Sequence, residues 1–141
     1  MADKSLTTTF GQTSGPGAAE TPNVGERLLG YLPGLNLNSV AQTTVFTFPA
    51  GITGGVVTRV HIKNYSGAAT TASISFGRTG TPTDWKATAT NANAATTKMV
   101  EYTNTASLAP VFSASDVFVA NVTIAQGSAA TADVLVFGYC F

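Results

Sequence analysis

The clearest periodic pattern in this chain is the run Val56-Val57-Thr58-Arg59-Val60-His61-Ile62-Lys63-Asn64. On an extended backbone one face of this run carries Val56, Thr58, Val60 and Ile62, and the other carries Val57, Arg59, His61 and Lys63. An alternation with a period of two predicts a half-buried β-strand. We expect its outer face to present a solvated basic stripe.

Segments with the same alternation lie on both sides of this run. They are Val45–Phe48, Ala72–Phe76, Lys98–Thr103 and the stretches 117–125 and 133–141. Turn-forming residues separate them at intervals of eight to twelve residues, which is typical of antiparallel sandwiches and small barrels. We therefore predict an all-β fold, an antiparallel β-sandwich or jelly roll, with 77–96 as a long connection and 117–125 and 133–141 as a hairpin through Gln126-Gly127-Ser128.

The composition excludes several classes of function. The 141 residues include seven basic and seven acidic side chains, and charged residues make up 10% of the chain, against roughly 25% in an ordinary soluble domain. A chain without net charge has no field that attracts nucleic acid, and it has no apolar run of the roughly 20 residues that span a bilayer. We expect no nucleic-acid and no membrane partner, and a surface partly covered by other protein.

The chemistry-bearing residues are too few for an active site or a metal site. His61 is the only histidine and Cys140 the only cysteine, so neither a zinc cluster nor a disulfide within one chain is possible. On its strand face His61 lies between Arg59 and Lys63, which would disfavour a protonated imidazole. We predict no catalytic residue, no metal and no cofactor, and hence no enzyme.

The first 41 residues differ from the rest of the chain, and we predict two parts: an extended N-terminal arm over 1–41 and a β-sandwich domain over 42–141. Ser5–Phe10 could form a short strand, and a glycine-rich stretch follows it. Pro22-Asn23 with Glu26 resembles a helix start, which predicts a short helix ending at Pro33-Gly34. The first five residues lack the apolar core of a signal peptide, so we expect the protein to stay in the cytoplasm where it is made.

The last third repeats a short pattern, because Asp116-Val117 and Asp133-Val134 both place an aspartate where a strand begins. Such a side chain accepts backbone N–H groups as the chain enters a sheet. The final strand is apolar on both faces, which means that both faces are covered. One face carries Leu135, Phe137, Tyr139 and Phe141, and this face is either a subunit interface or part of the chain's own core.

A charge-poor, Thr- and Ala-rich sandwich with this arm, two Ala-x-Asp-Val-x-Val-like strand entries and the final strand Val134–Phe141 resembles small virion proteins of tailed bacteriophages. Capsid decoration, or cement, proteins are the most similar of these. The resemblance implies a homotrimer on the outside of an icosahedral head, which braces neighbouring capsomers and contacts the major capsid protein. The capsid-binding residues would be Leu6, Thr8 and Phe10 in an added strand, with Leu28, Leu29, Tyr31 and Leu32 in a groove.

Two other classes remain open. Trp85, within the polar sequence Asp84-Trp85-Lys86, could stack on a sugar ring in a tail-fibre or baseplate module that binds host-surface carbohydrate. The arm could also serve donor-strand exchange in a filament-forming structural subunit. Removal of residues 1–41 distinguishes a decoration protein from a carbohydrate-binding module, since it would abolish capsid attachment but leave glycan binding unchanged.

Overall fold

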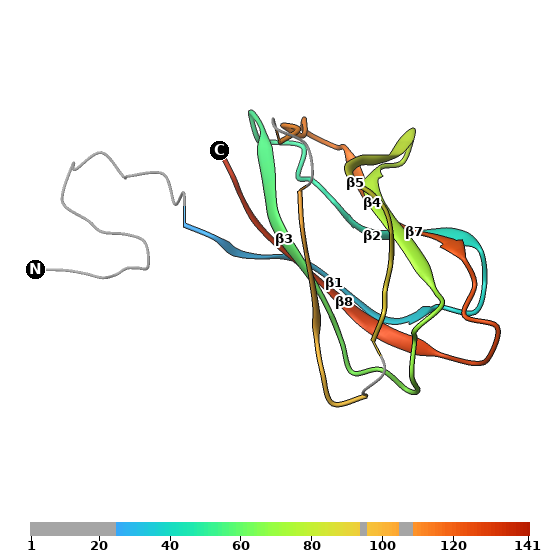
Figure 1. The fold of residues 1–141 in the computed structure, drawn as a ribbon. Helices are drawn as coiled ribbons and strands as arrows, with labels where there is room; N and C mark the ends of the chain where they lie inside the picture. The colour runs from blue at the N-terminus through green and yellow to red at the C-terminus, as the bar shows by residue number, and fades with distance from the viewer. Residues whose placement is uncertain (1–24, 94–95, 105–108) are drawn as a thin grey trace, which may run out of the picture.

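A computed structural model of the chain describes residues 25–93, 96–104 and 109–141. These residues form eight β-strands in two four-stranded antiparallel sheets, without any helix (Figure 1). The strands are β1 (Arg27–Asn36), β2 (Ala41–Thr47), β3 (Gly55–Lys63), β4 (Ser73–Arg78), β5 (Thr81–Thr90), β6 (Val100–Thr103), β7 (Val117–Ile124) and β8 (Thr131–Cys140). The predicted all-β antiparallel sandwich is confirmed.

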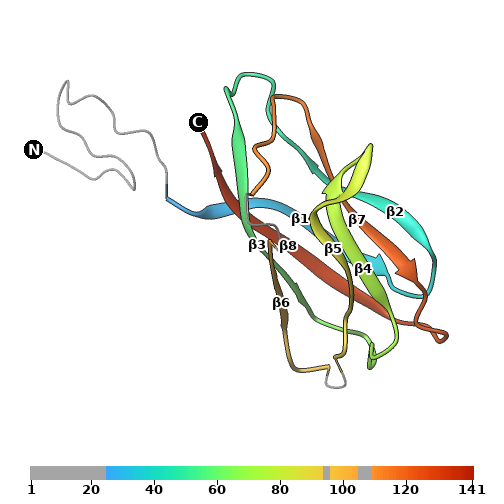
Figure 2. The same ribbon diagram turned by 45° about the horizontal axis from the view of Figure 1, so that its top comes forward.

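The strands pair as four nested couples: β1 with β8, β2 with β7, β3 with β6, and β4 with β5. One sheet has the order β1-β8-β3-β6 and the other β2-β7-β4-β5, as Figure 2 shows. This is the strand order of a jelly roll, in which one long hairpin folds over itself. Strands from opposite ends of the described chain therefore lie side by side.

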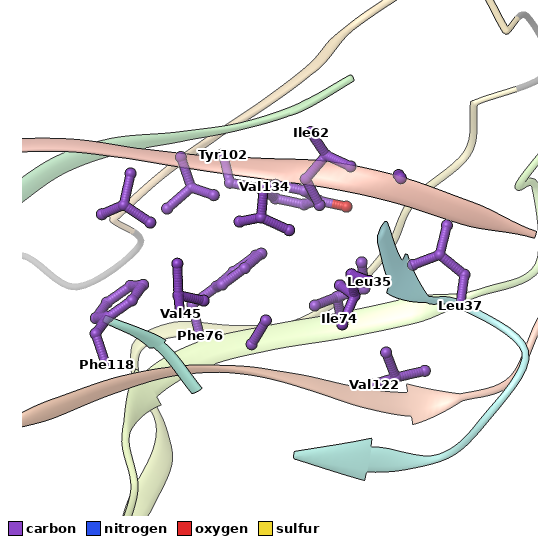
Figure 3. Close-up of a cluster of buried hydrophobic side chains, with 14 of the residues drawn as sticks. Leu35, Leu37, Val45, Ile62, Ile74, Phe76, Tyr102, Phe118, Val122 and Val134 are labelled. Carbon is purple, nitrogen blue, oxygen red and sulfur yellow. The ribbon is translucent and has the colours of Figure 1, made fainter. Parts of the chain in front are cut away.

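The core fills the space between the two sheets. Figure 3 shows Ile62, Tyr102 and Val134 of one sheet pointing towards side chains of the other. The facing residues are Ile74, Phe76, Phe118 and Val122, all of which are fully buried. Aromatic rings dominate one end, where Phe48, Phe112 and Phe118 pack with centroids 4.9 to 5.6 Å apart. Burial of this apolar area is the main force that holds the sheets together.

The predicted short helix is wrong, because the residues from Arg27 to Asn36 form β1 and pair with β8. The sandwich therefore begins within the segment that we predicted as arm. Two register shifts in β1, between Leu28 and Gly30 and between Leu32 and Leu35, explain the error. Each shift breaks the period of two, so that the apolar side chains fall at a spacing that imitates a helix.

The predicted long connection over 77–96 is also wrong, since it contains β5, which pairs with β4 along the edge of its sheet. The pairing shifts register on both sides of Phe76, which masks the alternation in the sequence. Alanine and threonine also give a weak apolar contrast between the two faces of this strand. Neither the pattern nor the composition of this segment therefore distinguished strand from loop.

The predicted hairpin between the last two strands does not exist, because β7 and β8 lie in different sheets. The connecting segment crosses from one sheet to the other and is held by the end of β1. There the Gln126 N–H donates to the carbonyl of Leu37, and the Leu37 N–H donates to the carbonyl of Ala130. The Gln126 side chain also accepts from the N–H groups of Thr71 and Ala72.

A bulge at Thr58 changes the facing of β3 halfway along the strand. Val60 and Ile62 point into the core as predicted, but in the first half of the strand Val57 is buried where we expected Val56. Arg59, His61 and Lys63 pair with outward-facing residues of β8, so the charged stripe lies on the outer face as expected. The bulge therefore places apolar and charged residues of β3 on one surface.

Candidate functional site

The outer face of the sheet β1-β8-β3-β6 carries a continuous apolar patch. We define the apolar patch as Leu28, Tyr31, Val56, Leu135, Phe137 and Tyr139. Cross-strand pairing places these side chains on one side of the sheet, since Tyr31 pairs with Leu135 and Leu28 with Phe137, and Val56 with Tyr139. Leu28 is 50% exposed and Tyr31 51%. Contiguous apolar surface of this kind marks a site of protein contact.

A cluster of ion pairs borders the apolar patch on β3 and β6. We define the ion cluster as Glu26, Arg59, His61 and Glu101. The Arg59 guanidinium contacts both carboxylates, with Nη2 2.7 Å from Oε1 of Glu26 and Nη1 3.3 Å from Oε2 of Glu101. Nε2 of His61 lies 2.8 Å from the same Glu101 oxygen. The basic stripe lies on the outer face as predicted, but Arg59 and His61 are bonded to these two glutamates instead of being solvated on their own.

The ion cluster rests directly on the apolar patch. The Arg59 guanidinium lies over the Phe137 ring at 4.7 Å from its centroid, and the His61 ring lies 4.9 Å from the same ring. The His61 side chain is only 13% exposed. A cation over an aromatic face is attracted by the ring quadrupole. Arg59 is therefore fixed from two directions, by carboxylates at its nitrogens and by an aromatic ring beneath it.

Both glutamates of the ion cluster are held in the charged form. The hydrogen bonds from Arg59, followed by that from Thr58, lower the pKa of Glu26 from its ordinary value. The pKa of Glu101 is also lowered, first by His61 and then by Arg59. A hydrogen bond or cation that favours the carboxylate has this effect. Both carboxylates therefore stay ionised and paired with Arg59 throughout the neutral range.

Asp133, on β8, bonds to β1 and to the residue that follows β3, at one end of the sheet. Its carboxylate accepts from the Gly34 N–H at 3.0 Å, the Tyr31 hydroxyl at 3.2 Å and the Asn64 amide at 2.8 Å. The Asn64 bond, then the Gly34 bond, lower the pKa of Asp133. The predicted role of an aspartate at a strand entry therefore holds, but its donors come from other elements instead of a local turn.

Asp116 shows the same use at the opposite end of the sandwich. It accepts from the Ser113 N–H at 2.8 Å and from Nε of Arg78 at 3.1 Å, and the backbone bond, ahead of the arginine, lowers its pKa. Arg78 also donates to Asp84 and to the carbonyl of Val111, and lies over the Phe112 ring. Every contact in this cluster joins β4, β5 and the segment before β7 of the same chain, so its role is structural.

Trp85 cannot stack on a sugar in this fold. The indole is 1% exposed, and its Nε1 donates to the carbonyl of Val57 at 2.9 Å. The ring packs edge-on against Phe76 and Phe118 in the core. The sequence placed Trp85 in a polar loop, whereas it fills the centre of the sandwich. The proposed sugar platform is therefore wrong.

The four apolar residues that we predicted to bind the capsid from the N-terminal arm lie on β1 and separate into two pairs. Leu28 and Tyr31 are exposed in the apolar patch, whereas Leu29 and Leu32 pack against the core. Leu6, Thr8 and Phe10 lie outside the described residues. Of the predicted interface residues, Leu135, Phe137 and Tyr139 are half-buried on the same face as Leu28 and Tyr31. The fourth, Phe141, follows the end of β8 and is 48% exposed. Residues predicted for capsid binding and residues predicted for the subunit interface therefore lie on one surface.

Glu26 and Glu101 are the functional residues that the sequence analysis missed. Glu101 lies opposite His61 because β6 pairs with β3, and Glu26 reaches Arg59 from before β1. Neither contact follows from sequence spacing, because each needs the strand order and register. A net charge of zero was the one hint, since it requires acidic partners somewhere for the basic residues.

The outer face of the other sheet has a different character. Its outward residues on β2, β4 and β7 are small or polar and uncharged: Gln42, Thr44, Ser75, Asn121 and Thr123. Asn121 donates to Ser75 and Thr123 donates to the Ser73 carbonyl, so these side chains bond among themselves. The charges of the two sheets are thus concentrated on one outer face and at the ends.

The residues that the structure describes offer little for other kinds of site. Those residues contain no group of three or more side chains able to hold a metal ion, and no helix capable of crossing a membrane. A hollow of about 340 Å³ lies between the start of β1 and the end of β2. It is lined by Arg27, Leu28, Leu29, Phe46, Thr47, Pro49 and Cys140. Its lining lacks the several convergent polar groups of a typical ligand site.

Comparison with known proteins gives one informative likeness. No protein-family model and no curated protein matches the sequence. A solved structure described as "Cyanophage Pam1 capsid asymmetric unit" contains a similar chain, at 18% identity and a TM-score of 0.57. The match covers 96% of this chain and 99% of that one. At the level of fold, the expected likeness to a phage capsid component is confirmed.

Proposed function

We propose that this chain is a structural protein of a phage virion. The observation that carries the proposal is the fold likeness to a chain of a cyanophage capsid, which extends over nearly the whole of both chains. The described surface supports it, because its main feature is a patch suited to protein contact and not a reactive centre. The proposal therefore assigns assembly, and not catalysis, to this protein.

In more detail, the chain decorates and stabilises an icosahedral capsid as a homotrimer that bridges capsomers. The major capsid protein is its partner, the capsid surface is its place, and assembly takes place in the host cytoplasm. Residues 1–24, with Leu6, Thr8 and Phe10, bind the shell. Three such segments on one trimer raise the effective concentration for the second and third contacts, so each contact can be weak.

The carbohydrate-binding alternative loses its central residue, since Trp85 is buried. A glycan-binding module built on this fold would need another aromatic platform. The exposed aromatic Tyr31 bonds through its hydroxyl to Asp133, and its neighbours are leucines and Phe137. Such a flat apolar surface suits protein better than a hydrated sugar.

The test begins with purified virions from the source of this sequence. Mass spectrometry of the particles should detect the chain, and antibodies raised against it should label the outside of intact heads. Recombinant full-length chain should rebind to particles stripped of it, whereas a variant that lacks residues 1–24 should keep its β-sheet circular dichroism and fail to rebind. A chain absent from virions, or rebinding that does not depend on residues 1–24, would contradict the proposal.

A further inference from the structure

We infer that the outer face of the sheet β1-β8-β3-β6 binds a second copy of this chain. The inference rests on the homo-oligomer of the proposed function, and it names the surface that forms it. It also moves Leu28 and Tyr31 from the predicted shell contact to the contact between subunits. The juxtaposition of Leu28 with Phe137 and of Tyr31 with Leu135 is the starting point.

The face is too small to hold two different partners side by side. Four strands about 4.8 Å apart and a ten-residue central strand that rises about 3.3 Å per residue outline roughly 600 Å². A stable interface buries about 800 Å² on each partner. A shell contact through β1 and a subunit contact through β8 therefore cannot both use this face, and a single occupant must cover it.

The charges of the face are arranged for burial. Arg59 is neutralised by Glu26 and Glu101 and lies on Phe137, and His61 bonds to Glu101. Asp133 already accepts three hydrogen bonds from within the chain. A charge that is paired before an interface forms adds little to the desolvation cost of covering it. The border of the apolar patch can therefore lie at an interface without new partners.

The balance of charge favours a copy of the chain as occupant. The charged residues on this outer face, with Glu26 before β1, are three acidic and two basic: Glu26, Glu101, Asp133, Arg59 and Lys63. Arg27 lies on the other side of β1, with Leu29 and Cys140. Near a rotation axis the same residues of every copy converge, so a face with a large excess of one sign would repel its copies. A nearly balanced face keeps this repulsion small, whereas it offers little net attraction to a charged partner.

The layout of the face matches the anatomy of an interface between subunits. Apolar residues lie on β1 and β8, and the ion cluster lies to one side on β3 and β6. Interfaces have an apolar centre and a polar rim. The inference therefore places β1 and β8 nearest the axis of the oligomer, with Arg59, His61 and Glu101 at its rim.

The first experiment measures the molar mass of the full-length chain by light scattering on a sizing column, over a dilution series. Wild-type protein should be an oligomer, near three times 14.4 kDa for a trimer. Leu28→Glu should raise the concentration at which the oligomer dissociates by about tenfold or more, since it puts a like charge on each copy near the axis. Thr44→Glu, an exposed position on the outer face of the other sheet, should leave the mass unchanged.

A second measurement distinguishes loss of the interface from loss of the fold. Leu28→Glu and Leu28→Lys proteins, each dissociated alone, should form an oligomer again when they are mixed. Unfolded variants would not recover in this way. Wild-type protein that is monomeric at all concentrations would overturn both the homo-oligomer and this inference. An oligomer that survives Leu28→Glu but dissociates with Thr44→Glu would overturn the inference and leave the homo-oligomer of the proposed function intact.

The result does not depend on capsid binding. If the chain is absent from virions but the variants behave as expected, the interface stands and the virion function fails. If wild-type monomers bind stripped particles and Leu28→Glu abolishes this binding, the shell is the occupant of the face and the inference is overturned.

Discussion

Gly138 lets two backbone segments approach within a distance that no other residue allows. A Cβ atom built at Gly138 would lie 2.0 Å from the Val56 carbonyl oxygen, which is backbone and cannot move aside cheaply. The close approach accompanies the bulge that begins after Val57, on the neighbouring strand. The residue therefore fixes the point where β3 changes the side chains that it presents to the core.

Gly138→Ala is expected to destabilise the domain by about 1 to 3 kcal/mol, the range of overpacking changes, and by more if the bulge is lost. Gly51→Ala is the matched control, since a Cβ there meets nothing within 4 Å. Urea unfolding followed by tryptophan fluorescence measures both. Equal stability of the two variants would contradict the assignment.

Leu28 and Leu32 have different roles although both belong to β1. At a concentration where both proteins are monomeric, Leu28→Asp should leave stability within about 0.5 kcal/mol of wild type, because Leu28 is exposed in the single chain. Leu32→Asp should cost more than about 2 kcal/mol, because Leu32 packs against the core and its carboxylate would lose water. Thermal melts of the two single variants check this. A stable Leu32→Asp protein would show that β1 is not fixed to the sheet as described.

Individual strands show where sequence patterns succeed and where they fail. The alternation in β3 and the apolar run in β8 predicted both strands to within a few residues. β1 and β5 were missed, because register shifts at Gly30 and around Phe76 break the period on which such predictions depend. A bulge leaves no mark on composition, so pairing partners must be known before it can be placed.

Acid should weaken the hydrogen bonds and ion pairs that carboxylates make between the strands. The pKa values of Glu26, Glu101, Asp116 and Asp133 are all lowered in the folded chain. The unfolded chain then binds more protons than the folded one at low pH, so stability rises with pH there. These groups contribute fully above about pH 5, and their contribution is lost as pH falls through the lowered values. The melting temperature should decline below about pH 4.5.

Asp133→Asn tests the contribution of one of these carboxylates. The amide cannot accept all three bonds of the carboxylate, so the variant should melt below wild type at pH 7. The difference should shrink as pH falls below about 4, because the unfolded chain then gains a proton at Asp133 and the folded chain gains one only at lower pH. A difference in melting temperature that stays constant from pH 7 to pH 3 would show that the charge of Asp133 does not matter.

The whole molecule is a set of nested strand pairs, and this topology sets how it folds. β1 and β8 meet although Tyr31 and Asp133 are 102 residues apart in the chain. Such pairings close long loops, which slows folding to milliseconds or seconds. Stopped-flow refolding followed by the fluorescence of buried Trp85 should show no complete recovery within microseconds. A submillisecond return to the native signal would contradict the expectation that formation of the nested strand pairs is the slow step.

The fold class and six of the eight strands were predictable for the whole molecule, but the pairing was not. The alternating segments predicted β2, β3, β4, β6, β7 and β8, whereas the hairpin expected between β7 and β8 is replaced by a crossing between sheets. The ion cluster and the single outer face are consequences of that pairing, since His61 and Glu101 meet only when β3 lies beside β6. Long-range contacts of this kind leave no local trace in one sequence.

The position of β8 between β1 and β3 bears on how the protein is made. While the ribosome synthesises the chain, the first seven strands emerge with the centre of one sheet vacant, so that β1 and β3 have no common neighbour. A nascent chain that stops before residue 131 is therefore not a smaller working subunit, because its unpaired strand edges favour aggregation. The sheet β1-β8-β3-β6 and its outer face therefore form only after β8 has been translated.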